Sequence, residues 1–319
     1  MTDGGADTAD TDVGALGAYL RGVAMGAADA VPGVSGGTIA LITGIYDRLI
    51  AAFTSASPAL VRRVLADLVG DRGDLRTVFR EVDGAFLLAL GAGIATAILT
   101  VTRALDIALE SLPVLTYGFF FGLIAASAVV LRHEFRVDTP VRAAAGIGGV
   151  VVAFVASGSA SAALGVSPAA TFVAGAVAVS AMILPGISGS LLLVILGQYE
   201  RMTDALSAFV DALIALATGG SVAAVVDTSV PVVAFLAGGV VGLLTVAHAV
   251  RAALSARREA TLAFLVGLVV GALRAPVVRV GEEVPAWTTG VLAEFAVAAV
   301  VGALVVLGVE RAAGGIDLD

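Results

Sequence analysis

The sequence predicts an all-α polytopic membrane protein made of two inverted-topology repeats, each a re-entrant helical hairpin followed by three transmembrane helices. The first observation is composition: 59% of the 319 residues are hydrophobic and 14% are charged, unlike a soluble domain. The second is a set of apolar runs long enough to cross a bilayer. The third is a motif, Pro32-Gly-Val-Ser-Gly-Gly37, that recurs as Pro185-Gly-Ile-Ser-Gly-Ser190.

The charge balance excludes several classes of function. The net charge is −8 and every basic side chain apart from the histidines is Arg, so a basic nucleic-acid face is excluded. An acidic, Lys-free surface is typical of a halophile, although GC-rich coding alone would also replace Lys by Arg. Because the chain has no Cys, disulfides and thiolate metal sites are absent. We expect no metal site and no cofactor.

The first repeat is expected to cover residues 13–157. It follows a disordered acidic tail at 1–12, which lacks the basic start of a signal peptide. A hairpin at 13–53, broken by Pro and Gly, leads into a polar linker at 54–83. Three apolar spans follow, at about 84–104, 113–131 and 141–157.

The second repeat, at 168–309, has the same plan, so that the two repeats form one integrated membrane domain. Its hairpin is expected at 168–203 and its linker at 204–228. Its three spans are expected at about 229–250, 259–274 and 288–309. The segment from Tyr117 to Leu123 can also be aligned with Leu262–Leu268, which supports duplication of the whole half.

Counting crossings gives the topology. Each half crosses the membrane an odd number of times whether its hairpin is re-entrant or fully spanning, so the second half must be inverted. With both termini in the cytoplasm, twelve arginines fall inside and four outside, which follows the bias of cytoplasmic loops toward basic residues. The four outside are Arg103, Arg201, Arg274 and Arg279.

The repeated motif has the residues of a broken helix. Pro fixes φ and removes a donor, Gly permits sharp turns, and Ser35 or Ser188 is well placed to cap a new helix. The free N–H groups at such a helix start favour an anion. Irregular backbone at membrane depth is tolerated only inside protein or beside a wet cavity, so the two motifs predict a path for an anionic group.

Each motif is followed by Gly-x-Tyr-acid-Arg, which places Tyr46 and Arg48 after the first break and Tyr199 and Arg201 after the second. A continuous helix from Ser35 would carry Arg48 roughly 20 Å, back to the membrane surface. There each Arg is expected to receive a lipid phosphate. Snorkelling arginines beside belt tyrosines are the structural alternative.

Two acids and one base stand out inside the apolar segments. Asp29 corresponds to Met182 in the second copy and Arg21 to Ala174, so that only the first hairpin carries charge within the membrane. Asp29 is expected either to couple protons to transport or to hold the break through backbone N–H groups. Glu294 is a further buried acid, with pairing to Arg274 as its structural alternative.

The segments from Met25 to Thr38 and from Met182 to Ser190, with the Gly-x-Tyr-acid-Arg that follows each, resemble the PopT family of polyprenyl-phosphate translocases, formerly listed as a domain of unknown function. The resemblance covers nearly the whole chain. It implies a transporter, not an enzyme, that returns spent undecaprenyl-phosphate-type carrier lipid from the outer to the cytoplasmic leaflet of the cell membrane for envelope or glycan synthesis. In a haloarchaeal host, dolichyl phosphate would be the carrier.

The expected partners are therefore polyprenyl phosphate and the bilayer, while the oligomeric state is not indicated. The candidate substrate-binding residues lie in the two motifs and the arms that follow: Pro32, Gly33, Ser35, Gly36, Gly37, Thr38, Tyr46, Arg48, Pro185, Gly186, Ser188, Gly189, Ser190, Tyr199 and Arg201. The candidate coupling residues are Asp29, Glu294 and Arg21.

Three other classes stay open at this stage. A small-anion channel or transporter could use the same helix starts, and a structural assembly factor would have little use for paired breaks. A polyprenyl-diphosphate phosphatase would want His beside the break. The two histidines, His133 and His248, lie instead at span ends.

Overall fold

The computed structural model describes residues 14–55, 79–80, 82–133, 138–165, 167–182 and 188–312. Within these ranges the regular structure is helical, and no strand occurs. The helices are α1 (Ala15–Ala30), α2 (Gly36–Ile42), α3 (Tyr46–Ser55), α6 (Gly84–Ser111), α7 (Pro113–Val130), a 3₁₀ turn (Leu131–His133), α8 (Pro140–Leu164), α9 (Pro168–Ala181), α10 (Gly189–Ile195), α11 (Tyr199–Ala217), α12 (Val222–Ala272), α13 (Arg274–Glu283) and α14 (Thr289–Ala312). The expected tail, most of the first linker, Pro185 and Gly186 lie outside the described residues.

Among the residues that the structure describes, six helical segments are long and apolar enough to cross a membrane, which confirms a multi-pass membrane protein. They are Gly84–Ser111, Pro113–Val130, Pro140–Ser157, Val222–Leu243, Ala252–Glu283 and Thr289–Ala312. The first runs beyond its expected end at residue 104 because neither Gly nor Pro occurs between that residue and Pro113. The restriction that Pro places on the preceding residue ends the helix there, with Leu112 outside the helical region.

Helix α12 holds the span Val222–Leu243 and the first part of the span Ala252–Glu283. It is kinked at Arg257, near the start of the second span, where a φ of −151° and a ψ of 66° are not helical. The chain therefore crosses, bends at Arg257 and crosses again. After Leu273 the second span continues as α13, which reaches Glu283.

Exposed apolar side chains cover the outer faces of these spans. Ile147 of α8, Val297 of α14 and Leu304 of α14 are 63%, 63% and 62% exposed. Contact between such apolar faces and water would be unfavourable, whereas contact with lipid is not. The largest fully buried side chains include Phe120 and Leu123 of α7, so the core lies around that helix.

Four long helix pairs build the bundle: α1 packs along α6, α9 along the first part of α12, α7 along α14, and α8 along the second part of α12. Glycines allow these contacts. A Cβ added at Gly22 would overlap the carbonyl oxygen of Leu90, and one at Gly242 would overlap that of Ala176. Small residues at these positions therefore let the helices pack closely.

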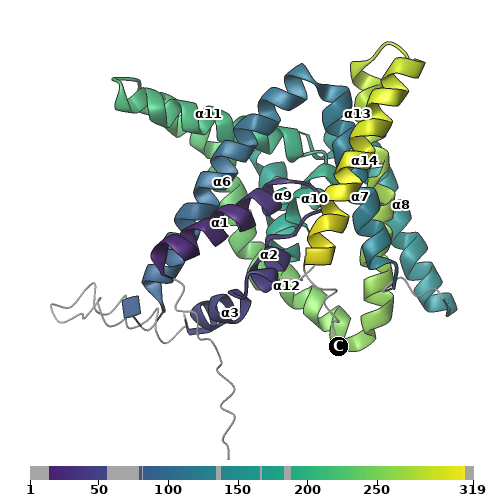
Figure 1. Cartoon of the computed structure of the whole chain (residues 1–319), viewed down its shortest axis with the longest axis horizontal. Helices are drawn as coiled ribbons and strands as arrows, with labels where there is room; N and C mark the ends of the chain where they lie inside the picture. The colour runs from purple at the N-terminus through teal and green to yellow at the C-terminus, as the bar shows by residue number, and fades with distance from the viewer. Residues whose placement is uncertain are drawn as a thin grey trace, which may run out of the picture.

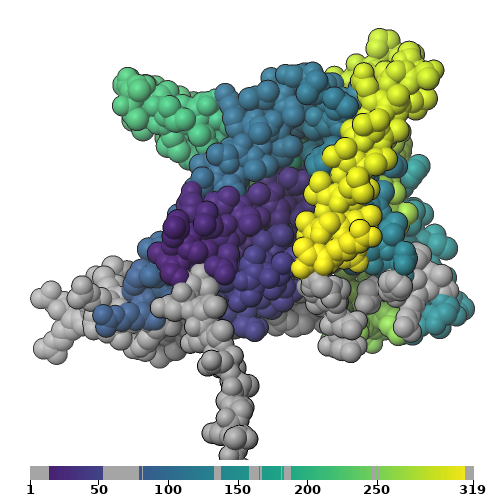
Figure 2. All heavy atoms as spheres, in the orientation of Figure 1, coloured from purple at the N-terminus to yellow at the C-terminus, as the bar shows by residue number. Residues whose placement is uncertain are grey.

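Figure 1 shows α11 and α13 at one end of the bundle, and α3, the kink of α12 and the end of α14 at the other. On the face seen in Figure 2, α1 and the residues after it fill the surface between α6 and α14. The first hairpin is thus built into the bundle wall.

The expected linker at 204–228 differs from the structure. Residues 204–217 continue α11, and α12 begins at Val222. The segment is rich in Ala and Leu and contains no Gly or Pro before Gly219, so nothing in it stops a helix. Since α11 is amphipathic and projects from one end of the bundle, it has the character of an interfacial helix.

Candidate functional site

The first break lies between α1 and α2. Pro32 is buried, Val31 is extended, and Gly33 has a φ of +90°. This φ favours glycine, and a Cβ there would lie 3.2 Å from the backbone of Leu123. The Ser127 hydroxyl donates to the Gly33 carbonyl oxygen at 2.7 Å. The break is therefore fixed against α7.

Asp29 holds the start of α2. The Gly36 N–H donates to its Oδ1 at 2.7 Å, while buried Ser35 makes no side-chain capping bond. The expectation that the Ser35 side chain caps this helix is wrong, because the carboxylate from the end of α1 accepts from its first N–H instead. Of the two roles expected for Asp29, the structure contains the capping role. Gly37 and Thr38 lie half-buried in the first turn of α2.

We expect Asp29→Ala to lower the free energy of unfolding by about 1–2 kcal/mol, since it removes a helix cap. Asp29→Asn keeps an acceptor oxygen and should lose less. Denaturant unfolding in detergent measures both, with exposed Asp47→Asn in the first turn of α3 as a near-neutral control. If Asp29→Asn instead removed the pH dependence of transport at unchanged stability, proton coupling would be its main role.

The second break differs in its side chains. Ser188 caps α10 by accepting from the Leu191 N–H at 3.4 Å, and its hydroxyl lies 2.9 Å from that of Ser190. Both serines are buried. Met182 packs beside Gly189, where a Cβ would lie 2.8 Å from its Cγ. An apolar side chain thus stands where the first break has a carboxylate.

Each arm after a break is only seven residues long. Gly44 and Gly197, with φ of +70° and +63°, end α2 and α10. The Ile45 N–H donates to the Ala40 carbonyl, and the Gln198 N–H to that of Leu193, which is the Schellman arrangement. The expected continuous helix of roughly 20 Å is wrong: seven residues rise about 10 Å. The glycine of Gly-x-Tyr marks a corner, not the middle of an arm.

The structure gives both motif arginines protein partners. Arg48 forms an ion pair with Asp83 at 2.6 Å and lies 4.3 Å from the centre of the Phe86 ring. Arg201 donates to the Gly165 carbonyl at 3.3 Å. Their proposed contact with a lipid phosphate stays a prediction. Tyr46 packs half-buried against the α1 and α6 core.

Tyr199 joins the two hairpins. Its hydroxyl donates to the Ala30 carbonyl oxygen, at the end of α1, at 2.7 Å. The side chain is buried and meets the ring of Phe120 edge to face, with centres 5.5 Å apart. The corner of the second hairpin therefore contacts the break of the first.

Arg21 and Glu294 take different places from those expected. The Arg21 guanidinium donates from Nε to the Thr43 carbonyl at 3.1 Å, which ties α1 to the end of α2. Glu294 is exposed on α14, so the expectation that it is a buried acid is wrong. Its expected partner Arg274 donates to the Phe154 carbonyl and stacks on that ring.

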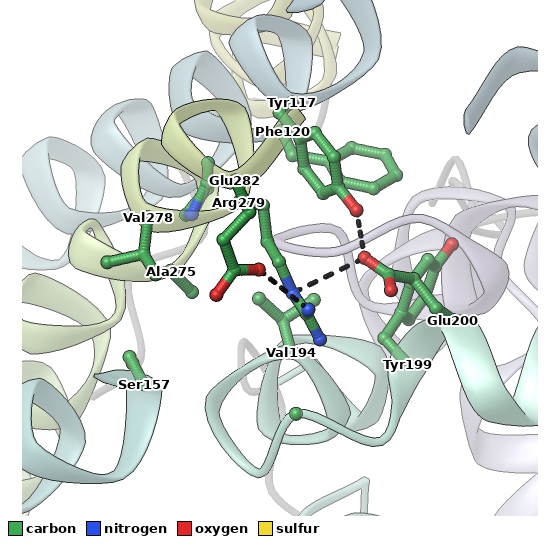
Figure 3. A pocket seen from close by; sticks show the side chains of 12 residues that line it. Tyr117, Phe120, Ser157, Val194, Tyr199, Glu200, Ala275, Val278, Arg279 and Glu282 are labelled. Carbon is green, nitrogen blue, oxygen red and sulfur yellow. Dashed lines mark hydrogen bonds and ion pairs between the residues drawn. The ribbon is translucent and has the colours of Figure 1, made fainter. Parts of the chain in front are cut away.

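A cavity lies beside the corner between α10 and α11. Its volume is about 30 Å³, room for about one water molecule. Arg279 of α13 is its cationic side chain: Nε lies 3.5 Å from Oε1 of Glu200, and Nη1 donates to Oε2 of Glu282 at 3.0 Å. The Tyr117 hydroxyl donates to the same Glu200 carboxylate. Figure 3 shows Arg279 between the two acids. The other lining residues are Phe120, Ser157, Val194, Gly197, Tyr199, Ala275, Pro276 and Val278.

Two opposing effects act on the pKa of Glu200, which pairs with Arg279. Burial raises the pKa of the Glu200 carboxyl, and the nearby Arg279 charge lowers it. Desolvation therefore weakens Glu200 as a partner for the guanidinium. A guanidinium held by such a carboxylate can exchange it for another anion with matching acceptors, and phosphate accepts from Arg in the same bidentate way.

From the sequence, Arg279 is expected on the non-cytoplasmic side and has no predicted role. One indication was available, because Arg279 is one of the few arginines on that side and follows the expected span at 259–274. The corner at Gly197, which brings Glu200 close to Arg279, was not predicted from the sequence. Among the described residues, no group of His, Asp and Glu is arranged to hold a metal ion.

Comparison with known proteins agrees with this transporter-like architecture. Residues 25–291 match a family described as undecaprenyl phosphate translocase-like. The chain belongs to this family. A polyprenyl-phosphate transporter of Vibrio cholerae serotype O1 is 36% identical over 273 residues, which cover 85% of this chain and 80% of that protein. No solved structure matches the chain. The family is named for translocation and the Vibrio cholerae relative for transport, and the protein is not an enzyme.

Proposed function

We propose that this translocase-family protein carries polyprenyl phosphate from the outer to the cytoplasmic leaflet of the cell membrane, so that the carrier lipid is reused in envelope or glycan synthesis. The observation that carries the proposal is the Arg279 cavity, a cationic site at the junction of both hairpins in a chain 36% identical to a polyprenyl-phosphate transporter. The polyprenyl tail stays in the lipid while only the headgroup enters the protein.

Exchange at Arg279 is the central step of this mechanism. The cavity is too small for a phosphate as it stands, so the structure corresponds to a closed state. A phosphate arriving from the outer leaflet replaces Glu200 on the guanidinium. Glu200 lies in the first turn of α11, which begins two residues after the Gly197 corner. Its release therefore lets that corner move and breaks the contact between Tyr199 and the first hairpin.

The motif residues have a supporting part in this proposal. Asp29 already occupies the start of α2, and α10 is capped by its own Ser188. Direct phosphate binding by these helix starts, and by Arg48 and Arg201, remains a separate prediction. Coupling of transport to protons or sodium, with Asp29 as first candidate, is likewise a prediction.

The proposal includes two inverted-topology repeats, and the glycine contacts support it. Gly93 packs on the Tyr19 carbonyl, and Gly238 packs on that of Phe172. The second pair consists of the positions equivalent to the first. Tyr19 and Phe172 differ by the 153 residues that separate the two motifs, and Gly93 and Gly238 differ by the 145 residues that separate Tyr117 from Leu262 in the aligned later segments. In the other pair of spans, Gly302 packs on the carbonyl of Phe119 and Gly149 on that of Phe264.

We further propose that both chain ends face the cytoplasm. Arg257 and Arg258 at the kink of α12 lie at the same end of the bundle as the end of α14, while Arg279 belongs to α13 at the opposite end (Figure 1). This division agrees with the bias of basic residues toward the cytoplasm. If the host lives in high salt, dolichyl phosphate is the proposed carrier.

Reconstitution into vesicles tests the function. Wild-type protein should move fluorescent polyprenyl phosphate between leaflets, read as loss of accessibility to an external phosphatase, and protein-free vesicles should not. Flux of chloride or inorganic phosphate without lipid movement would instead assign the protein to small-anion transport. Release of phosphate from polyprenyl diphosphate would assign it to the phosphatases.

A further inference from the structure

A second basic cavity lies at the opposite end of the bundle from Arg279. It is an open pocket of about 540 Å³ between the start of α8 and the kink of α12, within the size range of small-molecule sites. Thr139, Val141, Arg142, Arg257, Arg258, Glu259 and Ala260 line it. Nothing in the mechanism above uses this pocket.

Its charges are only partly paired. Arg142 donates to Asp138 at 2.6 Å and also pairs with Glu259. Arg257 and Arg258 are exposed, and neither guanidinium has an ion-pair partner among the residues that the structure describes. The pocket therefore has two uncompensated positive charges beside a neutralised one.

The backbone places these two arginines together. Arg257 has left the helical region, with φ −151° and ψ 66°, near the start of the candidate span Ala252–Glu283. The candidate span of α8 begins at Pro140, next to Thr139 of the pocket. The pocket thus lies where two spans end, at the level of lipid headgroups.

We propose that this pocket binds the phosphate monoester of the carrier lipid after it has crossed, and so forms the cytoplasmic station of the transport path. This inference rests on the proposed function. A phosphate monoester carries a charge of about −1.5 to −2 at pH 7, which matches two free guanidinium groups. The diester of a bilayer phospholipid carries one charge and matches them less well. Arg257 and Arg258 also present planar donors suited to phosphate oxygens.

Equilibrium binding of geranyl phosphate, a short soluble prenyl monoester, to the full chain in detergent tests the proposal. The measurement is made in an Arg279→Gln background, so that the other cavity does not contribute. Adding Arg257→Gln and Arg258→Gln should weaken binding by at least about tenfold, from the loss of charge-assisted hydrogen bonds. Arg311→Gln removes a charge from the exposed last turn of α14 at the same end and should change nothing.

Three results would overturn the proposal. Binding unchanged by the double substitution would exclude the pocket, and equal loss for the methyl diester of geranyl phosphate would indicate a general phospholipid contact. Equal affinity for inorganic phosphate would show a site for a free anion. None of these three results would contradict the proposed function, because leaflet transfer by the wild type is measured separately.

Discussion

Arg279→Gln should weaken polyprenyl phosphate binding about 10- to 100-fold and stop transport. The guanidinium is the cation of the closed cavity and already holds two carboxylates. Hydrogen bonds to charged groups contribute about 1.5–3 kcal/mol, and each 1.4 kcal/mol is tenfold in affinity. Arg279→Lys keeps the charge but loses the bidentate geometry, so an intermediate loss is expected. Initial rates of leaflet transfer at several lipid concentrations measure both variants.

The control for this prediction is Arg103→Gln. Arg103 is exposed, is expected on the same side of the membrane and pairs with Asp211 at 3.2 Å, so its loss should leave transport near wild type. Glu200→Gln gives a second check, because removing the competing carboxylate should tighten lipid binding. If Glu200→Gln and Arg279→Gln both weaken binding to the same extent, Arg279 has a structural role and the exchange mechanism is wrong.

Alanine at Gly93 or at Gly238 should lower the free energy of unfolding by about 1–3 kcal/mol, the usual cost of overpacking. In both cases the new Cβ overlaps a carbonyl oxygen of the neighbouring helix, so the helices must separate along their length. Since the two sites are equivalent in the proposed repeats, their costs should be similar. Unfolding in detergent, followed by circular dichroism against denaturant, measures the loss.

Gly91→Ala and Gly148→Ala are the matched controls. Both glycines lie inside spanning helices, and a Cβ at either would meet nothing within 4 Å. Alanine has the higher helix propensity, so these variants should be neutral or slightly more stable. A large cost at Gly93 with none at Gly238 would contradict the equivalence of the two halves.

The spans and the breaks could be predicted from the sequence because hydropathy and Pro-Gly pairs act locally. The six spans follow from apolar length alone, and Gly33 occupies the sharp turn that its motif implies. The resemblance to the PopT family is likewise confirmed by the comparisons. Local pattern was thus sufficient for the all-helical, multi-pass membrane class and for the family.

The site was only partly predictable because its contacts join distant segments. Asp29, and not Ser35, caps α2, since the end of α1 folds back on it. Gly197 was aligned correctly as part of the repeat, but its positive φ turned a supposed arm into a corner. That corner brings Glu200 against Arg279, 79 positions later in the chain, which no local pattern indicates.

A structure determined in lipid nanodiscs with a short-chain polyprenyl phosphate bound would show directly whether the phosphate replaces Glu200 on Arg279. We expect phosphate density within hydrogen-bond distance of the Arg279 guanidinium, with Glu200 moved away and the Gly197 corner opened. Phosphate density at the starts of α2 and α10, with Arg279 still paired to Glu200, would contradict the exchange mechanism.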